Sequence, residues 1–103
     1  MGYIYFIANK DKIKIGYTKN SVEKRLKQLQ TGNDEYLVLL GFLRGGPEEE
    51  KMLHKQFAQY RIRQNGEWFF PSEELLEYIN ANNAQPHTYV DWVDNRLLPL
   101  LKI

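Results

Sequence analysis

Two strand-like runs separated by a short turn begin the sequence, and they constrain its fold more than any other feature. The first run is YIYFI at residues 3–7, the second is IKIGY at residues 13–17, and Asn9-Lys10-Asp11 lies between them. Their alternation and their β-branched and aromatic content predict an antiparallel β-hairpin. Gly16, near the end of the second run, indicates either a bulge or a place where another group comes close to the backbone.

Helical and strand-like segments alternate along the rest of the chain. The expected elements, in order, are a helix capped by Asn20, a strand over residues 35–43, a helix from Pro47 to Tyr60, a short strand over residues 67–70 and a helix after Ser72. This order, β-β-α-β-α-(β)-α, predicts an α+β fold with a small, mainly antiparallel sheet flanked by helices.

Length and composition limit the classes of protein that fit. A chain of 103 residues fits one domain. We expect that domain over residues 1–80, with residues 81–103 forming a linker and an apolar segment that packs back on it. The absence of cysteine excludes disulfides and cysteine-ligated zinc. No apolar run approaches the roughly 18 residues of a membrane span, so we expect a cytoplasmic protein without a membrane partner.

Charge is unevenly distributed along a chain whose net charge is only +1. Residues 1–27 carry a net charge of +5 and residues 51–70 a net charge of +3, whereas residues 28–50 and 71–103 are acidic. The two basic blocks are either ordinary solvated charge or two parts of one anion-binding surface.

The reactive side chains suit phosphodiester cleavage better than other chemistry. His54 and His87 are the only histidines, too few for a zinc site without cysteine, and no serine–histidine–aspartate pattern or phosphate-binding glycine loop stands out. Arginine and lysine can hold a phosphate in transfer. One glutamate can place a hydrated Mg²⁺, and a tyrosine near cations can act as a base.

Several of these residues fall into an ordered set of motifs. The triplets Tyr3-Ile4-Tyr5 and Lys14-Ile15-Gly16, followed by KIGYTKNSVEKRLKQL, EKMLHKQF and NGEWF, resemble the GIY-YIG nuclease superfamily. The match covers about residues 2–80 and is nearest to the compact phage and bacterial branch, where KIG often replaces YIG. The resemblance implies metal-dependent DNA cleavage, with Mg²⁺ or Mn²⁺, on a three-stranded sheet flanked by helices.

The resemblance also implies a role for each matching residue. Tyr5 would be a base or a group that positions water, Lys14 and Arg25 would bind phosphate, and Gly16 would allow close packing. Glu50 would be the metal ligand, with His54 four residues later as a further catalytic residue. The nucleic-acid backbone is expected to contact the hairpin and first helix, at Tyr17, Lys19 and Lys24.

The residues by themselves leave alternatives open at each of these positions. Glu49 and Glu50 flank the apolar face of their helix almost equally, and either could simply complement the helix dipole. Tyr5 could be sheet packing, Arg25 could pair with Glu23, and His54 could bond a carbonyl. Glu67 could serve the fold or place a second carboxylate near the metal.

Two departures from the family pattern accompany the motifs. Many members carry a histidine or tyrosine one helical turn after the arginine, where this sequence has Leu29. The asparagine often found late in the site has no clear match, although Gln64 and Asn65 lie in that region. A nuclease therefore competes with a non-catalytic nucleic-acid-binding module and with a protein-interaction domain. For so short a chain we expect low sequence preference alone, or targeting by a homodimer or a partner protein.

Overall fold

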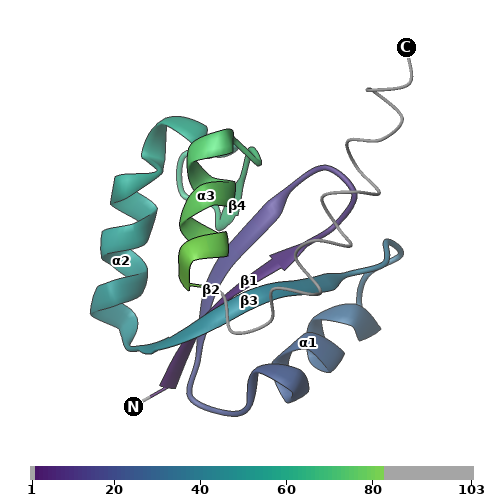
Figure 1. The fold of residues 1–103 in the computed structure, drawn as a ribbon. Helices are drawn as coiled ribbons and strands as arrows, with labels where there is room; N and C mark the ends of the chain where they lie inside the picture. Colours follow the sequence, from purple (N-terminus) through teal and green to yellow (C-terminus); the bar gives the residue numbers. More distant parts are fainter. Residues whose placement is uncertain (1, 83–103) are drawn as a thin grey trace.

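A four-stranded antiparallel sheet lies at the centre of the fold, in the order β3-β1-β2-β4 (Figure 1). The computed structural model describes residues 2–82. Its elements are β1 (Gly2–Ala8), β2 (Ile13–Thr18), α1 (Val22–Thr31), β3 (Val38–Gly45), α2 (Pro47–Gln56), a short 3₁₀ helix η1 (Ala58–Tyr60), β4 (Trp68–Phe69) and α3 (Glu73–Asn82). The α+β prediction is confirmed.

The hairpin forms as predicted because its turn is closed by one side chain. Asn9 Oδ1 accepts hydrogen bonds from the backbone nitrogens of Asp11 (2.8 Å) and Lys12 (2.7 Å). Such Asx bonds replace the backbone pairing that a turn cannot provide. The closed turn sets a register in which Tyr5 pairs with Gly16 and its neighbour Phe6 with Ile15.

Each face of the sheet carries its own apolar cluster. One cluster lies under α2 and α3 and includes Ile4, Phe6, Ile15, Leu53, Phe57, Leu75 and Ile79. The other lies under α1 and includes Tyr5, Ile7, Val22, Leu37 and Leu39. Figure 1 shows α1 on the opposite side of the sheet from α2 and α3. Because strand side chains alternate between faces, Tyr5, Lys14 and Gly16 all belong to the α1 face.

A β-bulge in β3 keeps its side chains directed toward the apolar clusters on the two faces of the sheet. The neighbouring residues Phe6 and Ile7 pair with Gly41 and Leu39, so Leu40 is an extra residue in β3. Without it, the residues after position 40 would face the wrong side, since a one-residue slip exchanges the two faces. The bulge therefore lets Phe42 join Tyr5 on the α1 face.

The helices begin at identifiable caps, one of which differs from the prediction. Ser21, and not Asn20, is the N-cap of α1, with its hydroxyl accepting from the backbone of Lys24 at 3.1 Å. The Asn20 backbone instead donates to the Thr18 hydroxyl (3.1 Å). Ser72 caps α3 as predicted, accepting from the backbone of Leu75 at 3.1 Å.

Three features of the elements also differ from the expectations. The sheet has four strands rather than three, because Trp68 and Phe69 pair with β2. The third strand begins at Val38 rather than at residue 35, and α2 ends at Gln56, with the 3₁₀ helix η1 covering Ala58–Tyr60. The expected apolar C-terminal segment lies outside the described residues. No helix within residues 2–82 is long and apolar enough to cross a membrane.

Candidate active site

Tyr5 and Arg25 meet on the α1 face of the sheet. Tyr5 is only 1% exposed, and its hydroxyl accepts a hydrogen bond from Arg25 Nε at 3.4 Å. This bond and the electrostatic interaction with Tyr5 raise the pKa of Arg25, although partial burial acts in the opposite direction. Gly16 makes the arrangement possible, because the Tyr5 ring occupies the space of its missing side chain. The close approach that Gly16 suggested is therefore present in the structure.

Lys14 lies two residues before Gly16 on the same face of β2. Its Nζ pairs with Glu67 Oε1 at 3.2 Å and lies 5.6 Å from the ring centroid of Trp68. The lysine side chain is 16% exposed, whereas that of Glu67 is 45% exposed. Because the pair is partly open to solvent, its net contribution to stability is small, about 0–1 kcal/mol. Lys14 can exchange this partner for a phosphate at little cost.

Glu50 differs in burial from Glu48 and Glu49, its two neighbours at the start of α2. Glu48 and Glu49 are exposed, and a Glu49 carboxylate oxygen accepts from the backbone nitrogen of Gly46. Glu49 thus closes the helix N-terminus. Glu50 is half-buried. Burial raises the pKa of Glu50, as does the charge of Glu67, while the charge of Lys14 acts to lower it.

Glu67 interacts with several of these groups. Its carboxylate pairs with Lys14, and its charge also raises the pKa of both Arg25 and Glu50. A backbone bond fixes its position, since the carbonyl of Glu67 accepts from the nitrogen of Ile15 at 2.9 Å. Lys14, Arg25 and Glu50 come from three different elements, β2, α1 and α2. The Glu67 carboxylate thus contacts Lys14 and acts electrostatically on Arg25 and Glu50.

These donors fit a hydrated divalent cation. No group of three or more histidine, cysteine or acidic residues suited to a metal occurs within residues 2–82. Mg²⁺ nevertheless needs only one or two carboxylates, because it keeps several of its waters. The mutual repulsion that raises the pKa of Glu50 beside Glu67 is one that a divalent cation relieves.

His54 is held between β2 and the segment after η1. Its Nε2 lies 2.8 Å from the carbonyl oxygen of Ile15, and its Nδ1 lies 2.7 Å from Arg61 NH2. A carbonyl only accepts and a guanidinium only donates, so these bonds require a neutral ring protonated at Nε2. Both ring nitrogens are occupied. The geometry thus favours the carbonyl-bonding alternative for His54 over a proton-transfer role.

The two bonds to Ile15 have a consequence for the site. The backbone nitrogen of Ile15 donates to Glu67, and its carbonyl accepts from His54, one helical turn after Glu50. Helix α2 and the segment that carries Glu67 are therefore both bonded to the same residue of β2. Arg61, which bonds His54, is itself held by two contacts. It donates to the carbonyl of Gln64 at 3.0 Å and lies over the Phe69 ring.

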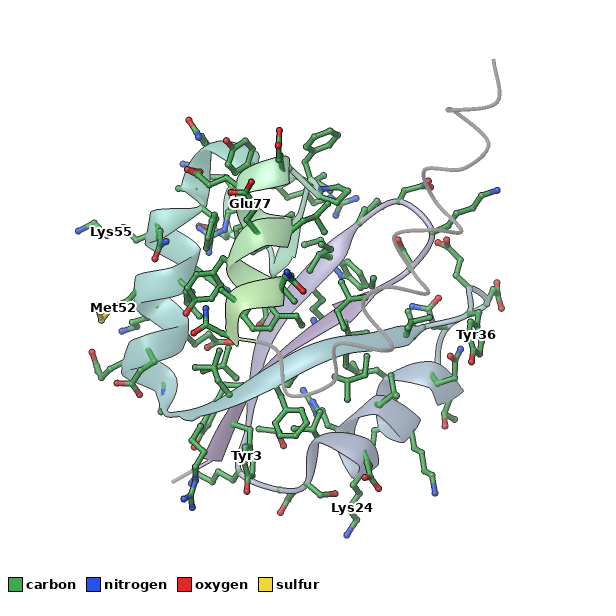
Figure 2. The ribbon with its side chains drawn as sticks, viewed as in Figure 1. Tyr3, Lys24, Tyr36, Met52, Lys55 and Glu77 are labelled. Atoms are coloured by element: carbon green, nitrogen blue, oxygen red, sulfur yellow. The ribbon has the colours of Figure 1, made fainter. Side chains whose placement is uncertain are left out.

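The residues predicted to bind nucleic acid lie farther apart. Tyr17 belongs to the other face of the sheet, where it packs against the cluster under α2 and α3. Lys19 and Lys24 are exposed, and Figure 2 shows Lys24 projecting outward from α1. Leu29 packs against the cluster under α1.

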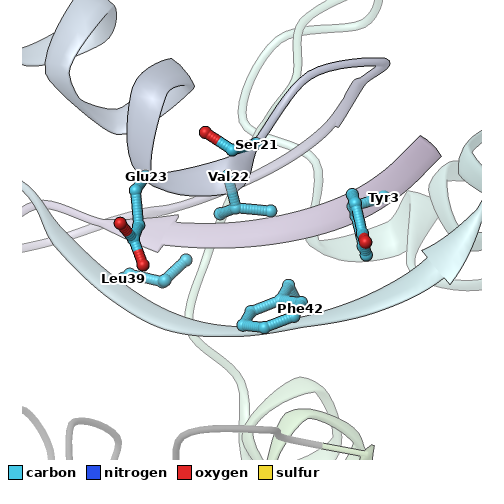
Figure 3. Close-up of a pocket in the computed structure, with 6 residues that line it drawn as sticks. All are labelled: Tyr3, Ser21, Val22, Glu23, Leu39 and Phe42. Atoms are coloured by element: carbon cyan, nitrogen blue, oxygen red, sulfur yellow. The ribbon is translucent and has the colours of Figure 1, made fainter.

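A cavity of about 240 Å³ lies beside the N-terminal turn of α1 (Figure 3). It is lined by Tyr3, Ser21, Val22, Glu23, Leu39 and Phe42. Glu23 and Arg25 are two residues apart, about 200° around the helix. The cavity therefore lies on the opposite flank of α1 from the Tyr5–Arg25 contact and is separate from the site.

Two members of this arrangement were not assigned from the sequence. The motif NGEWF drew attention to Glu67 but left its role open, and the structure places its carboxylate against Lys14. Arg61 was missed altogether. No local pattern connects Arg61 with His54, because they meet only after η1 turns the chain back.

Comparison with known proteins gives one match. The family model described as the T5orf172 domain matches residues 2–83. This domain is found in phage-type and bacterial nuclease-like proteins, some of them related to GIY-YIG enzymes, but no GIY-YIG family model matches. No curated protein and no solved structure matches the chain.

Proposed function

This chain belongs to the T5orf172 domain family, and from that premise we propose that it is a metal-dependent DNA endonuclease of the GIY-YIG type. The observation that carries the proposal is the ion pair between Lys14 and Glu67, together with the hydrogen bond between Arg25 and the Tyr5 hydroxyl. The charge of Glu67 also raises the pKa of Arg25 and of Glu50. A module that only bound nucleic acid would have no need for a half-buried metal carboxylate.

The cations of the site would hold the scissile phosphate. Arg25 offers a planar fork of donors, and Lys14 offers a mobile point charge whose present partner is Glu67. Both charges would be held in place before the reaction, so they stabilise the negative charge that develops on the phosphate oxygens. Phosphate binding would replace the contact between Lys14 and Glu67.

The Tyr5 hydroxyl would orient the attacking water. Its oxygen accepts from Arg25 Nε, which leaves the hydroxyl hydrogen available to donate. The buried ring, seated over Gly16, fixes the direction of that donation. Positioning of this kind lowers the barrier because less orientational freedom is lost during the reaction.

Glu50 would be the metal ligand, with the Glu67 carboxylate near enough to act on it electrostatically. A bound Mg²⁺ or Mn²⁺ would supply a more acidic water and stabilise the leaving oxygen. His54 would act as a positioning residue, because its bond to Ile15 fixes α2, and with it Glu50, against β2.

A nicking assay on supercoiled plasmid tests the proposal. With Mg²⁺ or Mn²⁺ we expect conversion to open circles, and in EDTA we expect none. Cleavage that persists in EDTA would remove the metal mechanism. If DNA binds but stays intact with every cation, the chain is a binding module.

A further inference from the structure

A second cavity, of about 370 Å³, lies at the β2–β4 edge of the sheet. Its lining residues are Lys12, Ile62, Arg63, Gly66 and Trp68. Lys12 comes from the hairpin, and the others come from β4 and the segment that leads into it. Two backbone hydrogen bonds shape this segment. The nitrogen of Ile62 donates to the carbonyl of Trp68 at 3.0 Å, and the nitrogen of Gly66 donates to the carbonyl of Arg63 at 3.0 Å.

The walls of the cavity combine cations with one aromatic ring. Lys12 and Arg63 are exposed, Trp68 is half-buried, and no acidic side chain is among the lining residues. Lys12 belongs to the first basic block of the sequence and Arg63 to the second. The fold thus joins both blocks at one place, which ordinary scattered surface charge would not require.

This cavity continues the candidate active site along the same strand. Lys12, Lys14 and Gly16 alternate along one face, and two strand residues span about 7 Å. The Nζ of Lys14 also lies 5.6 Å from the ring of Trp68, which lines the cavity. The cavity therefore adjoins Lys14 directly.

We propose that this cavity binds an unpaired nucleotide of the substrate strand, with its base stacked on Trp68 and its phosphates held by Lys12 and Arg63. The proposal rests on the endonuclease function, because it treats the cavity as part of the substrate path. A stacking platform needs a base whose flat face is free. The preferred substrate is then DNA with a single-stranded segment, such as an overhang, flap or branch, rather than intact duplex.

Binding in EDTA tests the cavity without any contribution from cleavage. The probes are a fluorescently labelled (dT)₁₂ and a blunt duplex of the same length. We expect tighter binding of (dT)₁₂. Trp68→Leu should weaken it between about fivefold and a hundredfold, the range expected for loss of one stacked base. Trp68→Phe, which keeps an aromatic face, should retain most of the affinity.

The salt dependence of binding tests Lys12 and Arg63 separately from Trp68. Lys12→Ala and Arg63→Ala should each lower the slope of log affinity against log salt by about 0.7, the value for one phosphate of a single strand. Lys55→Ala is the matched control, because this exposed lysine projects from α2 away from the sheet (Figure 2). The control should leave the slope unchanged.

A fluorescence titration remains informative if Trp68→Leu does not fold. The chain has two tryptophans, so a Trp92→Phe background leaves Trp68 as the only one. Saturating (dT)₁₂ should quench its emission. Unchanged emission, or equal affinity for duplex and (dT)₁₂, would overturn the proposal. Quenching without nicking in Mg²⁺ would instead reject the endonuclease function and leave nucleotide binding intact.

Discussion

Gly16 lies directly opposite Tyr5 in the β1–β2 pair, and a β-carbon at Gly16 would lie 2.3 Å from the Tyr5 hydroxyl oxygen. That distance is far inside van der Waals contact. The glycine is therefore required by the tyrosine ring and not by backbone conformation, since no glycine in residues 2–82 has a positive φ. The ring position in turn places the hydroxyl against Arg25.

Gly16→Ala should displace Tyr5 and harm both stability and catalysis. Overpacking of this kind costs about 1–3 kcal/mol, and the displaced ring could no longer hold its hydroxyl against Arg25. Urea unfolding and nicking rates measure the two effects. Gly32→Ala is the control, because a β-carbon there meets nothing within 4 Å. If Gly16→Ala matched the control in both measurements, the seating of Tyr5 on Gly16 would be wrong.

Stability of the metal-free protein should fall as pH rises through the titration of Glu50. Burial and the Glu67 charge raise the pKa of Glu50 above its ordinary 4.5. Between the two values the folded protein binds more protons than the unfolded chain, so stability decreases with pH in that window. Glu50→Gln should weaken this decline. Melting temperatures in EDTA from about pH 4 to about pH 7 measure it.

The same pH series with Mg²⁺ provides a check on the cause. Mg²⁺ binds the ionised carboxylate, so it should stabilise wild type more as pH rises and leave Glu50→Gln unaffected. If melting temperature changed with pH in the same way for wild type and Glu50→Gln, both with and without Mg²⁺, the raised pKa of Glu50 and its role as metal ligand would both be contradicted.

His54 should prove to be a positioning residue. His54→Leu removes the bond to the Ile15 carbonyl and leaves that buried acceptor unpaired, at a cost of about 1–3 kcal/mol. His54→Gln can still donate to the carbonyl, so it should recover much of the stability and the nicking rate. A general base would behave differently: both variants would lose activity equally, while His54→Gln stayed folded.

Lys19 and Lys24 should contribute to binding of duplex DNA through its phosphates. Each is exposed, so its replacement by alanine should change stability by no more than about 0.5 kcal/mol. Removing one lysine that neutralises a phosphate should lower the salt slope by about 0.9. Fluorescence anisotropy at several salt concentrations measures the slope. A slope equal to that of Lys55→Ala would remove the residue from the DNA surface.

The hairpin and the helices were predictable because their signals are local. Asn9 closes its turn within three residues, and the apolar stripes have the period of the element that carries them. A short strand over residues 67–70 was also expected, but its place in the sheet was not. Trp68 and Phe69 form only two ladder pairs, so their pairing depends on the tertiary position of β2 rather than on their own sequence.

The site was predictable only where a side chain's role follows from its motif. The resemblance selected Tyr5, Lys14, Arg25 and Glu50. The structure bonds Tyr5 to Arg25 and pairs Lys14 with Glu67, whose charge acts on Arg25 and Glu50. Periodicity could not choose between Glu49 and Glu50, because the choice depends on the cap bond to Gly46. Tyr17 was grouped with the site although strand alternation places it on the opposite face. Arg61 meets His54 only through the tertiary fold.

The proposed mechanism depends most on Arg25 and Glu50, which should serve catalysis rather than folding. Thermal unfolding and the Mg²⁺-dependent nicking rate, measured on the same preparations of Arg25→Ala and Glu50→Gln, test this directly. We expect both variants to melt near wild type, because each side chain is only half-buried. We expect nicking to fall by about a hundredfold or more. Nicking at the wild-type rate by either variant, or a lowered melting temperature with activity retained in the folded fraction, would contradict the mechanism.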